Sequence, residues 1–161
     1  MRRWSRGTGV LATGLLLLIP IGWAQERRNW YNDPFAQATS GYPQCPQPSG
    51  PLLTQQEMRE QAHVRVERGT SCALEGKCEP GGAYKRDAQI NERVRQALAT
   101  SSWLRNTSLW VTTQAGYVTL EGCVRGGRQQ RRLRALVEGQ QGVRYVIDGT
   151  TLGLPAKRPP G

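Results

Sequence analysis

Residues 116–124 read Gly-Tyr-Val-Thr-Leu-Glu-Gly-Cys-Val, and this stretch decides the fold of the second half of the chain. Its residues alternate between two faces of a β-strand. Val118, Leu120 and Val124 lie on one face, and the other face carries Tyr117, Thr119, Glu121 and Cys123. Such alternation is typical of an antiparallel sheet that is covered on one side only. The neighbouring segments should therefore supply the cover.

The segments around this strand predict an α-β-β-α-β order. Residues 108–113 are rich in strand formers and read as the antiparallel partner strand. A helix precedes it over about 88–99, with Asp87 as its N-cap, and a second helix follows over about 128–138. Residues 143–148 supply a third strand. Because each helix has a single apolar stripe to bury, we predict an α+β fold with two helices on one face of a mixed three-stranded sheet.

This pattern resembles a known family. Residues 86–153 resemble the BON domain, named for bacterial osmotically inducible and nodulation-related proteins. The resemblance rests on Asp87-Ala88-Gln89-Ile90, on residues 116–124 and on Gly142-Val143-Arg144-Tyr145-Val146. Cys123 and the glycine pair before the second helix depart from the family pattern. The resemblance implies a non-catalytic module, often of the periplasm or outer membrane, that engages phospholipid membranes or envelope polymers.

The chain outside this module is organised differently. Residues 25–85 read as a Pro- and Cys-rich extension that is irregular over its first half. One helix is predicted within the extension, over about 55–68, because Thr54-Gln55-Gln56-Glu57 is a capping box; Gly69 is expected to end it. Residues 154–161 read as a flexible tail.

The first 24 residues predict an export signal. Three arginines among the first six residues are followed by an apolar run over 11–19 and by a small-residue cleavage site that ends at Ala24. The run is shorter than the ~20 residues needed to span a bilayer, which argues against an uncleaved anchor. The mature chain would begin at Gln25, in the periplasm or outer envelope.

All four cysteines lie in this mature chain. An even number in an oxidising compartment favours two disulfides. Cys72 can pair with Cys78 across a bend at Gly76, and Cys45–Cys123 then follows by elimination. A zinc site would need clustered ligand pairs, which this spacing does not supply. We therefore expect no metal and no cofactor.

The positive charge of the chain lies in its C-terminal module. Residues 25–83 hold six basic and seven acidic residues, a net −1, whereas residues 84–153 hold eleven basic and five acidic residues, a net +6. A positive field attracts anionic surfaces. Export removes nucleic acid as a partner, which leaves anionic phospholipid membranes and acidic envelope polymers. Solubility alone is the other interpretation.

The candidate ligand site lies where the second helix of the module begins. Its residues are Arg125, Gly126, Gly127, Arg128, Arg131, Arg132 and Arg134. Free backbone N–H groups at a helix start hold phosphate, and neighbouring guanidinium groups grip its oxygens. The two glycines have a second explanation, since glycine is also an ordinary turn residue.

The uncovered sheet face leaves two possibilities. An aromatic platform for a sugar polymer would consist of Trp110, Thr112, Tyr117 and Thr119. Alternatively, residues 25–53 cover the face, and a bond between Cys45 and Cys123 favours this arrangement.

Catalysis has little support, because His63 is the only histidine and no nucleophile–base pair is evident. We therefore predict a non-catalytic envelope module that binds anionic phospholipid surfaces, in envelope maintenance or stress protection. The alternatives are a peptidoglycan- or polysaccharide-binding module and a scaffold subunit of an envelope protein complex.

Overall fold

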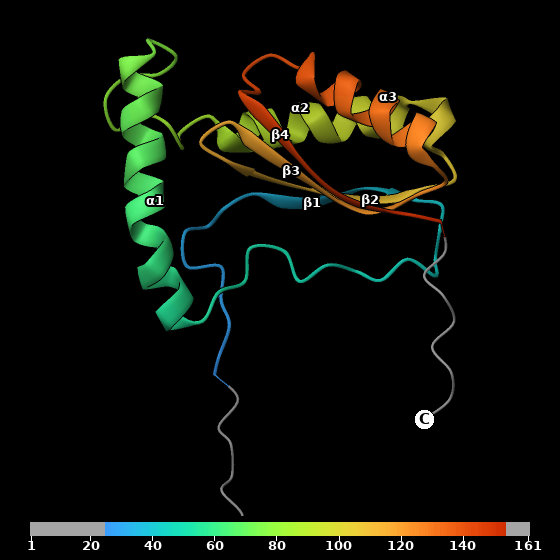
Figure 1. Ribbon diagram of the computed structural model, residues 1–161, viewed down its shortest axis with the longest axis horizontal. Helices are drawn as coiled ribbons and strands as arrows, with labels where there is room; N and C mark the ends of the chain where they lie inside the picture. Colours follow the sequence, from blue (N-terminus) through green and yellow to red (C-terminus); the bar gives the residue numbers. More distant parts are fainter. Residues whose placement is uncertain (1–24, 154–161) are drawn as a thin grey trace, which may run out of the picture.

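The computed structural model describes residues 25–153 (Figure 1). The predicted export signal, 1–24, and the predicted tail, 154–161, lie outside the described residues. Within 25–153, no helix has the length and apolar composition needed to cross a membrane.

The described chain is an α+β fold, as the sequence predicts. Its elements are β1 (Phe35–Ser40), α1 (Gln55–Leu74), α2 (Asp87–Thr100), the short 3-10 helix η1 (Ser102–Leu104), β2 (Ser108–Gln114), β3 (Tyr117–Val124), α3 (Gly127–Glu138) and β4 (Tyr145–Leu152). From α2 onward the order is the predicted α-β-β-α-β. The bounds of α2 and α3 differ from expectation by one residue at most, whereas β4 begins and ends later than predicted.

The sheet has the strand order β1-β2-β3-β4. The first three strands are antiparallel neighbours, whereas β3 and β4 run parallel because α3 carries the chain back between them. Helices α2 and α3 lie on the same side of this sheet (Figure 1). The main core lies between helices and sheet and includes Ile90, Val94, Leu98, Val118, Leu120, Leu133, Val137 and Val146.

The strand β1 corrects the prediction of a three-stranded sheet and of an irregular N-terminal segment. Phe35–Ser40 pairs with β2, with a bulge between Gln37 and Thr39. The strand is short and contains two alanines, which are poor strand formers. It forms because β2 offers an edge to pair with, and such a tertiary cause leaves little trace in the local sequence.

Residues 41–53, called the strap below, cross the sheet face that the helices leave open (Figure 1). Cys45 of the strap is bonded to Cys123 of β3, with the two Cα atoms 5.8 Å apart. Trp110 packs against this disulfide and is only 5% exposed. The predicted covering of this face is therefore confirmed. A sugar platform that uses Trp110 and Thr112 is wrong, because both residues are buried.

Helix α1 stands beside the sheet and is longer than predicted (Figure 1). The capping box is confirmed: Thr54 Oγ1 accepts the N–H of Glu57, and the Glu57 carboxylate accepts the N–H of Thr54. Gly69 does not end the helix but lies inside it, opposite Ala83. The helix ends further on, just before Gly76, which adopts a positive φ of 65°.

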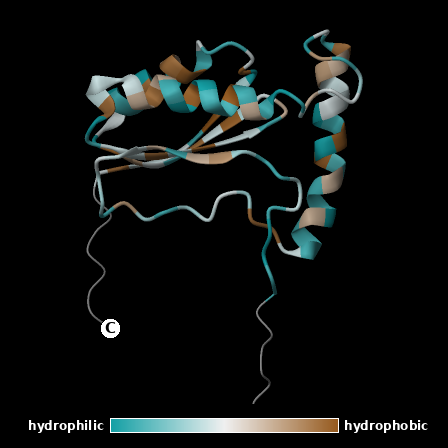
Figure 2. Cartoon of the chain, turned by 180° about the vertical axis from the view of Figure 1, so that it is seen from behind, coloured by the Kyte–Doolittle hydropathy of each residue, from teal (hydrophilic) through white to brown (hydrophobic). Residues whose placement is uncertain are grey.

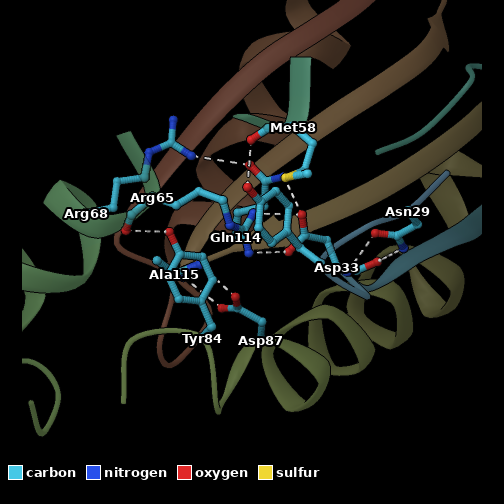
Figure 3. Close-up of polar contacts among 11 residues, drawn as sticks. Asn29, Asp33, Met58, Arg65, Arg68, Tyr84, Asp87, Gln114 and Ala115 are labelled. Atoms are coloured by element: carbon cyan, nitrogen blue, oxygen red, sulfur yellow. Dashed lines mark hydrogen bonds and ion pairs between the residues drawn. The ribbon is translucent and has the colours of Figure 1, made fainter. Parts of the chain in front are cut away.

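A buried ion pair fastens α1 to the sheet (Figure 3). The Arg65 guanidinium donates two hydrogen bonds of 2.8 Å to the Asp33 carboxylate. Its central carbon lies 3.9 Å and 4.3 Å from the ring centroids of Tyr31 and Tyr84. Gln114 Nε2, at the end of β2, donates to the same carboxylate at 2.7 Å. These contacts join the N-terminal segment, α1 and the β2–β3 hairpin.

Two aspartates have roles other than those predicted. Asp87 is the first residue of α2 and does not cap it. Instead, its buried carboxylate accepts the backbone N–H groups of Ala115 and Gly116 at 2.6 Å and 2.9 Å (Figure 3). These two residues turn the chain between β2 and β3, and both have a positive φ. Asp148 was expected at a strand end but lies within β4, where its Oδ1 accepts the N–H of Thr150 at 3.0 Å.

Side chains satisfy some of the backbone hydrogen-bonding groups of the edge strand β4. Besides the N–H of Thr150, which Asp148 accepts, the carbonyl of Thr150 accepts a hydrogen bond of 3.2 Å from Gln130 Nε2 of α3. Both backbone groups of this residue are thus satisfied without a neighbouring strand.

Candidate functional site

The predicted ligand site lies on α3 and on the short loop before it. Leu133 and Val137 of α3 are fully buried, and the arginines of the helix lie on its exposed side. From Gly122 to Val137 the sequence holds five arginines and no acidic residue. The fold therefore places a run of positive charge on one exposed surface.

One of these five arginines is neutralised within the helix. Arg134 Nε lies 2.7 Å from Glu138 Oε1, and this hydrogen bond raises the pKa of Arg134. Within residues 25–153, no ion pair involves the other four. These four residues, called the arginine patch below, are Arg125, Arg128, Arg131 and Arg132. All four are exposed.

Most of the predicted site lines one hollow of about 390 Å³. Its lining residues are Trp103, Arg125, Gly126, Arg128, Gln129 and Arg132. Gln129 joins the two sides of the hollow: its Nε2 donates to the Trp103 carbonyl and its Oε1 accepts the N–H of Arg125, both at 2.8 Å. Gly127, Arg131 and Arg134 are not part of this lining. The volume falls within the range of small-ligand sites, so the hollow has room for a phosphate and the groups bonded to it.

Trp103 and Gln129 are the site residues that the sequence did not indicate. The Trp103-Leu104 pair predicts only a packing anchor, and Leu104 fills that role because it is fully buried. Trp103 is only partly buried, and the Arg132 guanidinium lies 4.3 Å from its ring centroid. Because η1 and α3 are far apart in sequence, no local sequence pattern predicts their contact.

The glycines keep the start of α3 uncovered. Gly126 is the N-cap, and no side chain caps the helix. The backbone of Gly126 is extended, with φ 179° and ψ 169°, and Gly127 is not among the residues with a left-handed backbone, so the turn itself does not require glycine at these positions. A Cβ at Gly126 would meet nothing within 4 Å. The backbone N–H groups at the start of α3 thus lie beside the arginine patch without a capping side chain over them, an arrangement that suits a phosphate.

The cysteines take no part in the site. The predicted pairs Cys45–Cys123 and Cys72–Cys78 are both confirmed as disulfides, and no cysteine is free. Paired cysteines cannot act as thiolate nucleophiles or metal ligands. Among residues 25–153, no group of three or more His, Cys, Asp or Glu side chains is placed to hold a metal ion.

A second hollow, of about 710 Å³, lies along α1. Hydrophobic residues interrupt the hydrophilic surface of this helix (Figure 2), and Val66 and Leu74 line the hollow while remaining 68% and 84% exposed. Its lining contains no histidine, cysteine or carboxylate. His63 lies outside it, exposed and 3.0 Å from Glu67. These surroundings suit an apolar contact and provide no acid–base pair.

Comparison with known proteins identifies one part of the chain. Residues 86–153 match the family model of the BON domain. No curated protein and no solved structure matches the chain. The match begins just before α2 and ends just after β4, so it includes the arginine patch and Trp103 but leaves out β1, the strap and α1.

Proposed function

Because residues 86–153 form a BON domain, we propose that this protein binds anionic phospholipid headgroups at a membrane surface. BON domains are associated with phospholipid binding and the cell envelope, and they are generally non-catalytic. The arginine patch is the binding surface and an anionic bilayer is the partner. Binding leaves the lipid chemically unchanged and serves envelope maintenance or stress protection.

The uncompensated charge of the arginine patch is the observation that carries this proposal. Elsewhere in residues 25–153, many cationic side chains have a carboxylate partner. Such pairs are formed by Arg27, Arg28, Arg65, Lys77, Lys85, Arg95, Arg134 and Arg144. The four arginines of the patch have no such partner, and they are neighbours on one surface. They are therefore available to phosphate oxygens, which a guanidinium binds in bidentate fashion.

The strength of such binding follows from membrane electrostatics. Each arginine near an anionic bilayer contributes about 1 kcal/mol, so the patch contributes about 4 kcal/mol if all four approach the surface. The attraction is screened over about 8 Å at physiological ionic strength. Binding should therefore be peripheral, reversible and weakened by salt.

The proposed compartment is the periplasm or outer envelope. The export signal predicted in residues 1–24 supports it, and so do the two disulfides, since disulfides form and persist in oxidising compartments.

A scaffold role in an envelope protein complex is the second candidate. The observation that favours it is the hollow along α1, where Val66 and Leu74 are exposed. Contiguous apolar surface of this kind marks a site of protein contact. This surface lies in the extension, outside the BON domain, so both functions can coexist in one chain.

Replacing Arg125 and Arg128 together by alanine is expected to weaken binding to phosphatidylglycerol vesicles about thirtyfold at low salt, because two charges of about 1 kcal/mol each are lost. Both residues line the hollow, and neither stacks on Trp103. Co-sedimentation of residues 25–161 with vesicles measures the change. Wild-type binding should also fall as sodium chloride is raised.

The matched control replaces Arg59 and Arg86 by alanine, two arginines that form no ion pair among residues 25–153. Both side chains are exposed, and the variant loses the same charge outside the patch. It should bind vesicles nearly as well as the wild type. Equal losses in the two variants would mean that net charge alone drives binding and would contradict a defined site. Sedimentation with peptidoglycan but not with vesicles would favour the polymer-binding alternative.

A further inference from the structure

We infer that Trp103 enters the lipid interface when the arginine patch binds, so that the protein is held at the bilayer by an inserted indole as well as by charge. This inference rests on the proposed function. It adds Trp103 to the binding surface and places its ring below the level of the lipid phosphates. The occupant of the hollow beside α3 is then one anionic lipid of a bilayer, with its phosphate at the arginines and its glycerol region at the indole.

The first argument is position. Trp103 reaches the surface from η1 and lines the same hollow as Arg125, Arg128 and Arg132. The Gln129 side chain holds the Trp103 backbone carbonyl at 2.8 Å, which fixes η1 against the start of α3. An object that meets the arginines of this hollow therefore also meets the indole ring.

The second argument is that the core does not need all of this side chain. The neighbouring Leu104 is fully buried and anchors η1 in the core. Trp103 packs against the same core but remains partly exposed. A large aromatic side chain that stays at the surface, on an element already anchored by its neighbour, is available to a partner.

The third argument is the polar surroundings of the ring. The Arg132 guanidinium lies 4.3 Å from the ring centroid, so a cation lies against the indole. Among the hydrogen bonds of residues 25–153, none uses the indole N–H of Trp103 as donor, whereas the Trp30 indole donates to the Leu53 carbonyl at 2.7 Å. Trp103 thus offers an apolar ring and a free donor, the combination that places tryptophan at membrane–water interfaces.

The combination of arginines with an exposed indole favours a bilayer as the occupant of the hollow. Free phosphate would satisfy the arginines but would leave the indole in water. A bilayer satisfies both, because its phosphates lie directly above an apolar layer. A tryptophan at such a surface lies at the level of the headgroups, where its ring meets the apolar layer and its N–H meets polar groups.

Quenching of tryptophan fluorescence by brominated lipids tests this inference. The chain from residue 25 onward contains three tryptophans, Trp30, Trp103 and Trp110. Phosphatidylglycerol vesicles with brominated acyl chains should quench the wild type, and W103F should lose most of that quenching. W103A should also bind unbrominated vesicles about fivefold more weakly, because part of the apolar area buried by the ring is lost. Thermal unfolding of both variants checks that the fold is retained.

Trp30 provides a matched control. It is 37% exposed and also has an arginine against its ring, Arg28 at 5.5 Å, but Arg28 is paired with Glu26. W30F should keep the quenching. Vesicle binding with unchanged quenching in W103F, or without any quenching, would overturn the inference while leaving the proposed function intact. Absence of vesicle binding by the wild type at low salt would overturn both.

Discussion

Replacing Cys45 and Cys123 together by alanine is expected to lower the free energy of unfolding by about 4 kcal/mol, the largest effect that we predict for this chain. The two cysteines are 78 residues apart, so their bond closes a long loop and removes much conformational freedom from the unfolded chain. Its loss also frees the strap from the sheet and exposes Trp110, which is only 5% exposed in the fold. Urea unfolding followed by tryptophan fluorescence measures the difference.

The other disulfide is the control. Cys72 and Cys78 are six residues apart, so the same loop-entropy argument gives about 2 kcal/mol for their replacement by alanine. The strap variant should therefore unfold at a clearly lower urea concentration than the variant of the short loop. The reverse order would show that loop closure does not govern the stability of the strap.

The second large effect is expected at Asp87. Its carboxylate accepts two backbone N–H groups in the β2–β3 turn, from Ala115 and Gly116, in a buried environment. Burial raises the pKa of Asp87, while these two hydrogen bonds act in the opposite direction. D87A would leave both donors buried without an acceptor, and we expect a loss of about 3 kcal/mol in the free energy of unfolding. Thermal and urea unfolding of the purified variant measure this loss.

Asp148 offers a matched comparison, because it also accepts a backbone N–H, that of Thr150. It lies on the edge strand and is only partly buried, so water can replace the lost acceptor. D148A should therefore destabilise the chain by less than D87A does. Similar losses of unfolding free energy in D87A and D148A would contradict the idea that burial of the β2–β3 turn makes the Asp87 hydrogen bonds more important.

The module was largely predictable because its local patterns agree with its tertiary structure. Val118, Leu120 and Val124 alternate as a half-covered strand requires, and they are fully buried. The errors lie where distant segments decide the outcome. The strand β1 depends on the edge of β2. Gly69 reads locally as a stop but lies inside α1, where the helix passes Ala83.

The candidate site was predictable in its charge and not in its shape. A run of arginines without acidic residues is visible in the sequence, and it folds onto one surface because Leu133 and Val137 fix which side of α3 faces inward. The contact of Arg132 with Trp103 arises only when η1 packs beside α3. A residue that joins a site through tertiary packing has no spacing by which a sequence can reveal it.

The partly occupied edge of β4 bears on how two copies of this protein meet at high concentration. An exposed edge strand ordinarily acts as a template to which another chain can add. Here Asp148 and Gln130 already occupy the N–H and carbonyl of Thr150. A second copy that approaches this strand would therefore find its row of backbone donors and acceptors interrupted at Thr150. Addition of another strand to β4 is hindered at that position.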